Sequence, residues 1–102
     1  MSNRKEIVSN VIKELLSCSD GKYITEIYAK DGSIKNGEFT NWISIMIETD
    51  TKFVNESLYD CMDDIEERIE DGGYDFRLIL SIEPDTVERG HGTVLWKKGD
   101  KS

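Results

Sequence analysis

The sequence predicts an α+β domain with the element order αββαββ, in which a four-stranded antiparallel sheet carries two helices on one face. Two segments repeat apolar residues at helical spacing, four segments are rich in alternating apolar, β-branched or aromatic residues, and glycine-containing turns separate them. A chain of 102 residues has room for one domain. We expect that domain to span residues 1–97, and residues 98–102 to form a flexible C-terminal tail.

The helices are predicted at residues 3–17 and 54–70. Asn3 can cap the first helix, because Glu6 follows three residues later as in a capping box. The apolar stripe of the first helix consists of Ile7, Val8, Val11, Ile12, Leu15 and Leu16. The stripe of the second helix consists of Val54, Leu58, Cys61, Met62, Ile65 and Ile69.

The strands are predicted at residues 23–30, 39–48, 75–83 and 93–97. In the second strand Ile43, Ile45 and Ile47 alternate with other residues and share one face. An Asp-Gly and an Asn-Gly dipeptide indicate turns between the first two strands. The last two strands are expected to form a hairpin with a long polar loop at 84–92.

Two strand orders fit this pattern. Order 3-4-2-1 is a circular permutation of the ferredoxin-like fold. Order 2-1-3-4 places the third strand in the centre, which its continuous apolar run at 78–80 favours. The two halves also echo each other at residues 20–23 and 71–74, which is consistent with a pseudo-twofold αββ repeat, although turn chemistry by itself favours glycine at both places.

The net charge of −8, from 21 acidic and 13 basic residues, limits the classes of function that the sequence supports. A general nucleic-acid-binding surface is not expected, because neutralising phosphates requires clustered Lys and Arg. No apolar run approaches the roughly 20 residues that a membrane span needs. The N-terminal residues have charge but no apolar region behind it, so we expect no signal peptide and a cytoplasmic location.

The sequence does not indicate an enzyme, a metal site or a cofactor. His91 is the single histidine and lies between glycines, whereas a catalytic base is usually held rigidly. Cys18 and Cys61 are far apart in sequence and form no zinc motif. Antiparallel helices could bring the two cysteines together, but a cytosolic setting disfavours a disulfide, and the sequence leaves the bridge open.

Most of the net charge lies in one segment, residues 56–71, which holds eight acids and one base, Arg68. Like charges at helical neighbour spacings repel, and acids late in a helix oppose its dipole, so stability does not favour this pattern. A solvated face that raises solubility is one interpretation. The other is a docking surface for a basic partner, with Tyr59 at its edge. The candidate partner-binding residues on the outer side are Glu56, Asp60, Asp63, Asp64, Glu67, Glu70 and Asp71.

The sheet face away from the helices is a second candidate interface. It is expected to carry Trp42, Met46 and Ile79, together with Leu95 or Trp96. Partly apolar patches of this kind often mark a dimer or partner interface, unless loops or the tail cover them.

These patterns favour a small acidic binding protein that inhibits or neutralises a basic partner. Immunity proteins, antitoxins and phage anti-defence inhibitors with nucleic-acid-mimicking surfaces share this logic, because a nuclease or nucleic-acid-handling complex presents a positive groove to a carboxylate-bearing helix. The alternative is a small-ligand or regulatory domain that forms a homodimer through the open sheet face.

Overall fold

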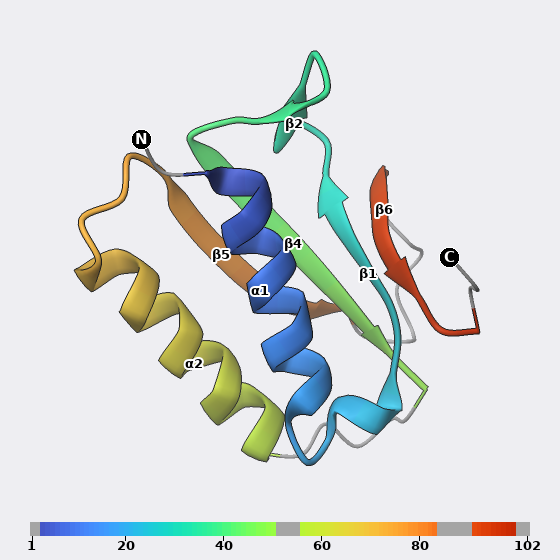
Figure 1. The fold of residues 1–102 in the computed structure, drawn as a ribbon. Coiled ribbons are helices and arrows are strands. Elements are labelled where there is room, and N and C mark those ends of the chain that lie inside the picture. The colour runs from blue at the N-terminus through green and yellow to red at the C-terminus, as the bar shows by residue number, and fades with distance from the viewer. Residues whose placement is uncertain (1–2, 51–55, 84–90, 100–102) are drawn as a thin grey trace.

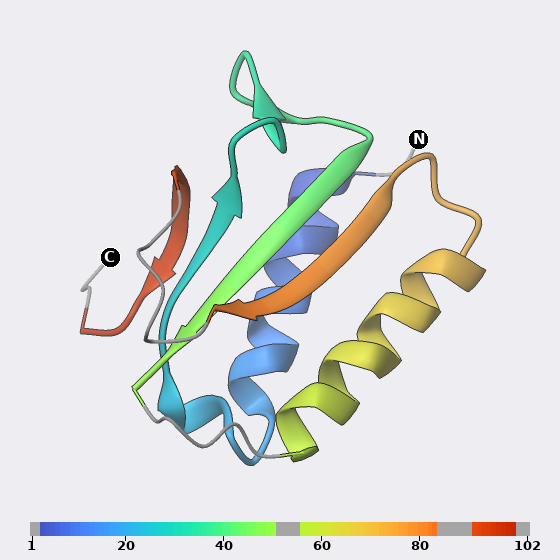
Figure 2. The ribbon, with the colours of Figure 1, turned by 180° about the vertical axis from the view of Figure 1, so that it is seen from behind.

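The computed structural model describes residues 3–50, 56–83 and 91–99. Its elements are, in order, α1 (Arg4–Ser17), a 3₁₀ turn η1 (Gly21–Tyr23), β1 (Ile24–Lys30), β2 (Ile34–Lys35), β3 (Glu38–Phe39), β4 (Trp42–Thr49), α2 (Glu56–Asp71), β5 (Arg77–Glu83) and β6 (Gly92–Lys97). Figures 1 and 2 show α1 and α2 running antiparallel on the same face of the sheet. The predicted α+β class and the one-sided placement of the helices are therefore confirmed.

The main sheet has the order β5-β4-β1-β6 and is mixed. β1 pairs antiparallel with both β4 and β6, whereas β4 and β5 are parallel. The prediction of an antiparallel sheet is wrong at this last pair, because α2 is a crossover helix that returns the chain to the end of the sheet where β4 began. Both predicted strand orders are also wrong, because β5 pairs with β4 at one edge and β6 pairs with β1 at the other.

β5 and β6 do not form the expected hairpin, because they lie at opposite edges of the sheet. Only the first half of the chain makes an adjacent antiparallel pair, β1 with β4, so the pseudo-twofold repeat is absent from the described sheet. β5 lies at an edge despite its continuous apolar run. Residues 84–90, which were expected to form the hairpin loop, fall outside the described residues.

The ends of α1 are formed as the sequence indicates. The backbone N–H of Glu6 donates to Oδ1 of Asn3 at 3.1 Å, which confirms the cap. After the helix the chain turns back so closely that a Cβ on Gly21 would lie 2.4 Å from the carbonyl oxygen of Leu16. Glycine is therefore required at this turn. Val54, predicted in the stripe of the second helix, falls outside the described residues.

A small ribbon formed by β2 and β3 was not predicted as separate strands. Asn36 and Gly37 both have positive φ, 54° and 80°, as a two-residue type I′ hairpin turn requires. The ribbon is fixed to the main sheet by Ser33, whose buried hydroxyl accepts a hydrogen bond from the N–H of Ser44 at 2.8 Å. The predicted Asn-Gly turn is thus correct, and it closes a shorter hairpin than expected.

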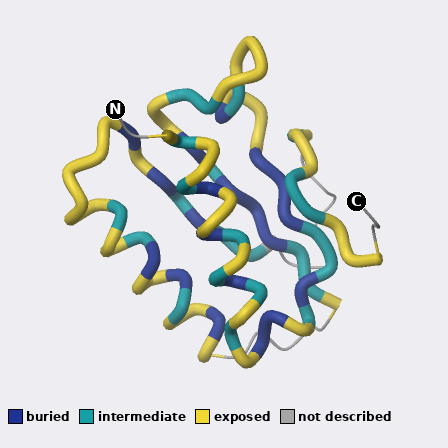
Figure 3. Tube along the Cα trace, in the orientation of Figure 1, coloured by how far each residue is buried: buried dark blue, intermediate teal, exposed yellow. Residues whose placement is uncertain are grey.

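The core lies between the sheet and the helices, where Figure 3 shows buried residues on the inner sides of both layers. Ile43, Ile45 and Ile47 are fully buried, as their alternation predicts. They pack in one cluster with Leu15 of α1 and Ile65 of α2. The inner face of each helix is therefore committed to the core, and its outer face is left to the solvent.

Candidate functional site

The helix α2 is divided sharply into a buried side and an acidic side. Leu58, Met62 and Ile65 are buried, and Cys61 and Ile69 pack partly buried against the same core. We call the opposite side the acidic face, and Figure 3 shows α2 exposed along that side. The acidic face consists of the seven predicted partner-binding residues, all of them exposed: Glu56, Asp60, Asp63, Asp64, Glu67, Glu70 and Asp71. Tyr59 is also exposed, at 46%.

Very little of this negative charge is neutralised within the described part of the chain. Arg68 is the base of the segment, and its Nε lies 3.5 Å from a carboxylate oxygen of Asp64. The same guanidinium donates a hydrogen bond to Glu14 of α1, and this bond raises the pKa of Arg68. Since Arg68 is shared between two carboxylates, the acidic face keeps most of its charge.

Glu66 is an exception among the acids of α2. It is half-buried, and its Oε1 accepts a hydrogen bond from the backbone N–H of Leu80 at 2.9 Å. This carboxylate therefore satisfies an outward-pointing N–H of the edge strand β5. Electrostatics by itself predicts Glu66 to be unfavourable near the end of the helix, whereas the contact with β5 gives it a structural role.

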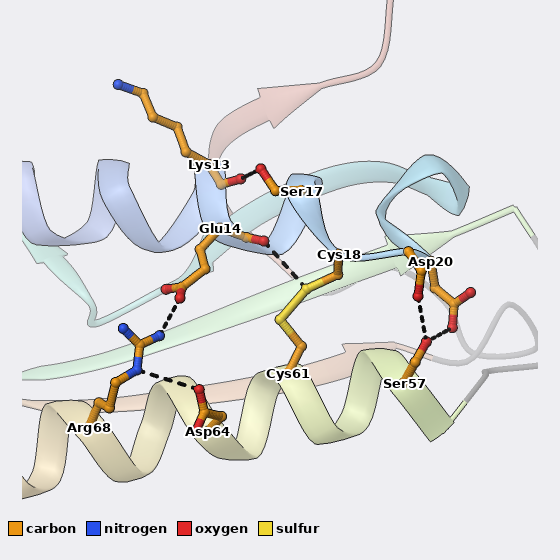
Figure 4. Close-up of a disulfide and its surroundings, with 10 residues drawn as sticks. Lys13, Glu14, Ser17, Cys18, Asp20, Ser57, Cys61, Asp64 and Arg68 are labelled. Carbon is orange, nitrogen blue, oxygen red and sulfur yellow. Dashed lines mark hydrogen bonds and ion pairs between the residues drawn. A yellow bond between two sulfur atoms is a disulfide. The ribbon is translucent and has the colours of Figure 1, made fainter.

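Three cross-links hold α2 against α1 and the following turn, as Figure 4 shows. A disulfide joins Cys18 at the end of α1 to Cys61 in α2. The Ser57 hydroxyl hydrogen-bonds the Asp20 carboxylate, and Arg68 reaches Glu14. The bridge that the sequence left open is thus formed, because the antiparallel helices place the two cysteines opposite each other. The acidic face is presented in a fixed orientation.

The second predicted interface is not a continuous exposed patch. Trp42 is 54% exposed and Ile79 of β5 is half-buried, but Met46, which lies further along β4, is 9% exposed. Its cross-strand neighbour Tyr28 is fully buried on the same face. The expectation that Met46 contributes to an open apolar surface is therefore wrong. Leu95 and Trp96 both pack against the core.

Trp42 also has a partner of its own. The guanidinium of Arg77, its register partner on β5, lies 5.6 Å from the centre of the Trp42 ring. A cation over an aromatic face at this distance is attractive. The most exposed aromatic of the second interface is thus already engaged within the chain.

The groups that could carry other chemistry are dispersed in the described residues. His91 is exposed, and its carbonyl oxygen accepts a hydrogen bond from the N–H of Asp31 at 3.2 Å. Among the residues at 3–50, 56–83 and 91–99, no three His, Cys, Asp or Glu side chains are grouped to hold a metal ion. Over the same residues, no helix combines the length and apolar character of a membrane span.

The sequence reasoning missed two hollows that flank the C-terminal end of α2. One, of about 260 Å³, lies between this end and β5, and the other, of about 400 Å³, lies between α1 and α2. Ile69 and Tyr74 line both of them. Tyr74, which directly follows the Gly72-Gly73 pair that ends α2, was the sequence signal for these hollows, because an aromatic side chain at that position lies near the last helical turn.

Comparison with family models, curated proteins and solved structures finds no match to this chain.

Proposed function

We propose that this protein is a binding inhibitor that neutralises a basic protein partner through the acidic face of α2, in the manner of an immunity protein, an antitoxin or a nucleic-acid-mimicking anti-defence protein. The observation that carries the proposal is the arrangement of seven exposed carboxylates on one fixed helix face. The apolar side of the same helix is committed to the core, so the acidic side is what a partner would meet.

The linear charge density of α2 supports a mimic of nucleic acid. Sixteen residues rise about 24 Å, so seven carboxylates supply about one negative charge per 3.4 Å of helix axis. One strand of duplex DNA carries its phosphates at about the same axial spacing of 3.4 Å. A positive groove that binds a nucleic-acid backbone therefore matches the acidic face in both sign and density of charge.

The positions of the acids also support a binding role over one in stability. Glu67, Glu70 and Asp71 lie near the C-terminal end of α2, where acids oppose the helix dipole. Glu66 is the acid of α2 whose carboxylate bonds the backbone of β5. Among the described contacts, the acidic face contributes one ion pair, Asp64 with Arg68, and no hydrogen bond to β5.

The alternative, a dimeric small-ligand or regulatory domain, has weaker support. In its expected interface Met46 is buried, and the Trp42 ring contacts the guanidinium of Arg77. Of the predicted residues Trp42, Met46 and Ile79, only the Trp42 ring and part of Ile79 are exposed in the described structure. Val94 of β6, the register partner of Tyr28, is also 46% exposed. No observation specifically favours a ligand there.

The test is competition with labelled duplex DNA and RNA for a panel of basic nucleases and nucleic-acid-handling proteins, read by fluorescence anisotropy. The wild type is expected to displace the duplex from at least one of them, more weakly as salt rises. Reversing Asp60, Asp63 and Glu67 to Lys should abolish the displacement.

The matched control reverses three exposed acids outside α2, Asp31, Glu38 and Asp50, and so changes the net charge equally. It should displace the duplex nearly as well as the wild type. The proposal is overturned if the wild type displaces nothing, or if the α2 variant and the control lose the same amount.

A further inference from the structure

The hollow between the C-terminal end of α2 and β5 adjoins the acidic face. Glu70 belongs to both, and Glu66, Tyr74 and Phe76 also line the hollow. Figure 1 shows this end of α2 beside the start of β5. A partner that contacts Glu70 on the acidic face is therefore also at the edge of the hollow.

Two carboxylates give the hollow its negative charge. Glu66 is fixed in place, because its Oε1 accepts the N–H of Leu80 at 2.9 Å. A carboxylate has about four acceptor positions, so this bond leaves Glu66 able to accept from a cation as well. The last carbonyl groups of α2 add the negative end of the helix dipole. Arg77 also lines the hollow, and its guanidinium lies over Trp42.

An aromatic ring gives the hollow a face that suits a planar cation. Tyr74 is 41% exposed, and its ring centre lies 5.4 Å from that of Phe76. The Tyr74 ring is packed so closely on Gly72 that a Cβ there would lie 2.5 Å from it. The ring therefore lies against Gly72 and near Phe76, and the residue is still 41% exposed.

The chain already pairs guanidinium groups with aromatic rings and carboxylates beside this hollow. Arg4 lies 5.9 Å from the centre of the Phe76 ring, and it forms an ion pair of 3.2 Å with Asp75. A guanidinium in the hollow would meet the same combination, an aromatic face in Tyr74 and a carboxylate in Glu70. Arginine suits such a site better than lysine, because its planar group both stacks and donates in a fork.

We propose that this hollow binds an arginine side chain that the basic partner presents, as the anchor of the interface. The inference rests on the proposed function and names the partner group that the acidic face by itself leaves unspecified. The volume of about 260 Å³ lies below the roughly 300–1,000 Å³ of sites for drug-sized ligands and suits a single side chain. Arginine is also among the residues that most often act as interface anchors.

The experiment is an NMR titration of the ¹⁵N-labelled protein with a blocked Gly-Arg-Gly peptide, compared with the same peptide carrying citrulline, which has the shape of arginine without its charge. The arginine peptide is expected to shift the amide signals of Tyr74, Phe76 and Glu70. Tyr74→Leu keeps an apolar group on Gly72 and should weaken binding about fivefold, whereas Tyr74→Phe, which keeps the ring, should restore it. Tyr59→Leu is the matched control, because Tyr59 is a comparably exposed tyrosine of α2 that does not line the hollow, and it should leave the shifts of the hollow's amide signals unchanged.

The inference is overturned if the shifts spread over the whole acidic face, if citrulline gives the same shifts, or if Tyr59→Leu and Tyr74→Leu behave alike. Its failure is distinguishable from failure of the proposed function. One result would separate the two: the Asp60, Asp63 and Glu67 reversals abolish displacement of the duplex, whereas Tyr74→Leu leaves it unchanged. That result would support the acidic face as the binding surface and reject the arginine anchor.

Discussion

Oε1 of Glu66 in α2 accepts a hydrogen bond from the backbone N–H of Leu80 in β5, 2.9 Å away. This contact connects the acidic helix to the exposed edge of the sheet, and it separates Glu66 from the other acids of the segment. In the described sheet β5 has a strand neighbour on one side only, β4, so its outward N–H groups need partners other than a strand.

Glu66→Ala is therefore expected to destabilise the protein by about 1–2 kcal/mol in urea unfolding, because it leaves the Leu80 N–H without its charged acceptor. Glu67→Ala, which removes an exposed carboxylate one residue later, should change the free energy of unfolding by no more than about 0.5 kcal/mol. Equal effects of the two substitutions would argue against a structural role for Glu66.

Neutralising the end of the acidic face should stabilise the fold. In Glu67→Gln/Glu70→Gln the repulsion between helical neighbours and the unfavourable dipole interaction both decrease, which predicts a gain of about 0.5–1 kcal/mol at low salt and less at high salt. The control is Glu56→Gln in the first turn of α2, where an acid complements the dipole, and it should lose stability by a few tenths of a kcal/mol. A loss of stability in the double variant would contradict this account.

The disulfide should make the stability of the protein depend on reducing agents. It links residues 43 apart in sequence, and closing a loop of that length stabilises the folded state by about 2–4 kcal/mol in the chain-entropy account. Urea unfolding with and without a dithiol reductant measures the difference. The Cys18→Ala/Cys61→Ala variant should resemble the reduced wild type and no longer respond to the reductant; an unchanged wild-type midpoint on reduction would show that the bridge does not contribute.

The protein is expected to be a monomer by light scattering, and Trp42→Asp should leave its mass unchanged, because Met46 is buried and the Trp42 ring is paired with Arg77. The substitution should cost at most about 1 kcal/mol of stability, the size of an exposed cation–π contact. A dimeric mass that the substitution converts to monomer would instead support the alternative interface on the sheet.

Local patterns predicted the elements well. Helical spacing located both helices, the Asn3 cap is present, and the alternation of Ile43, Ile45 and Ile47 identified the buried face of β4 correctly. These features depend on residues within a few positions of one another, so the sequence contains their cause. The exposure of the seven acidic-face residues follows in the same way, because the apolar stripe of α2 fixes which side is buried.

Long-range pairing decided the rest. The strand order depends on how the whole chain packs around α2: β5 pairs with one side of β4, and β6 forms the opposite edge of the sheet. The spacing of residues within a single element does not determine these pairings. The same packing places Cys18 next to Cys61 and Glu66 next to β5. It also buries Met46 and forms the hollow lined by Tyr74. The sequence by itself thus determined the elements and the acidic face, and the tertiary structure decided what that face adjoins, because contacts between distant segments form only once the layers pack.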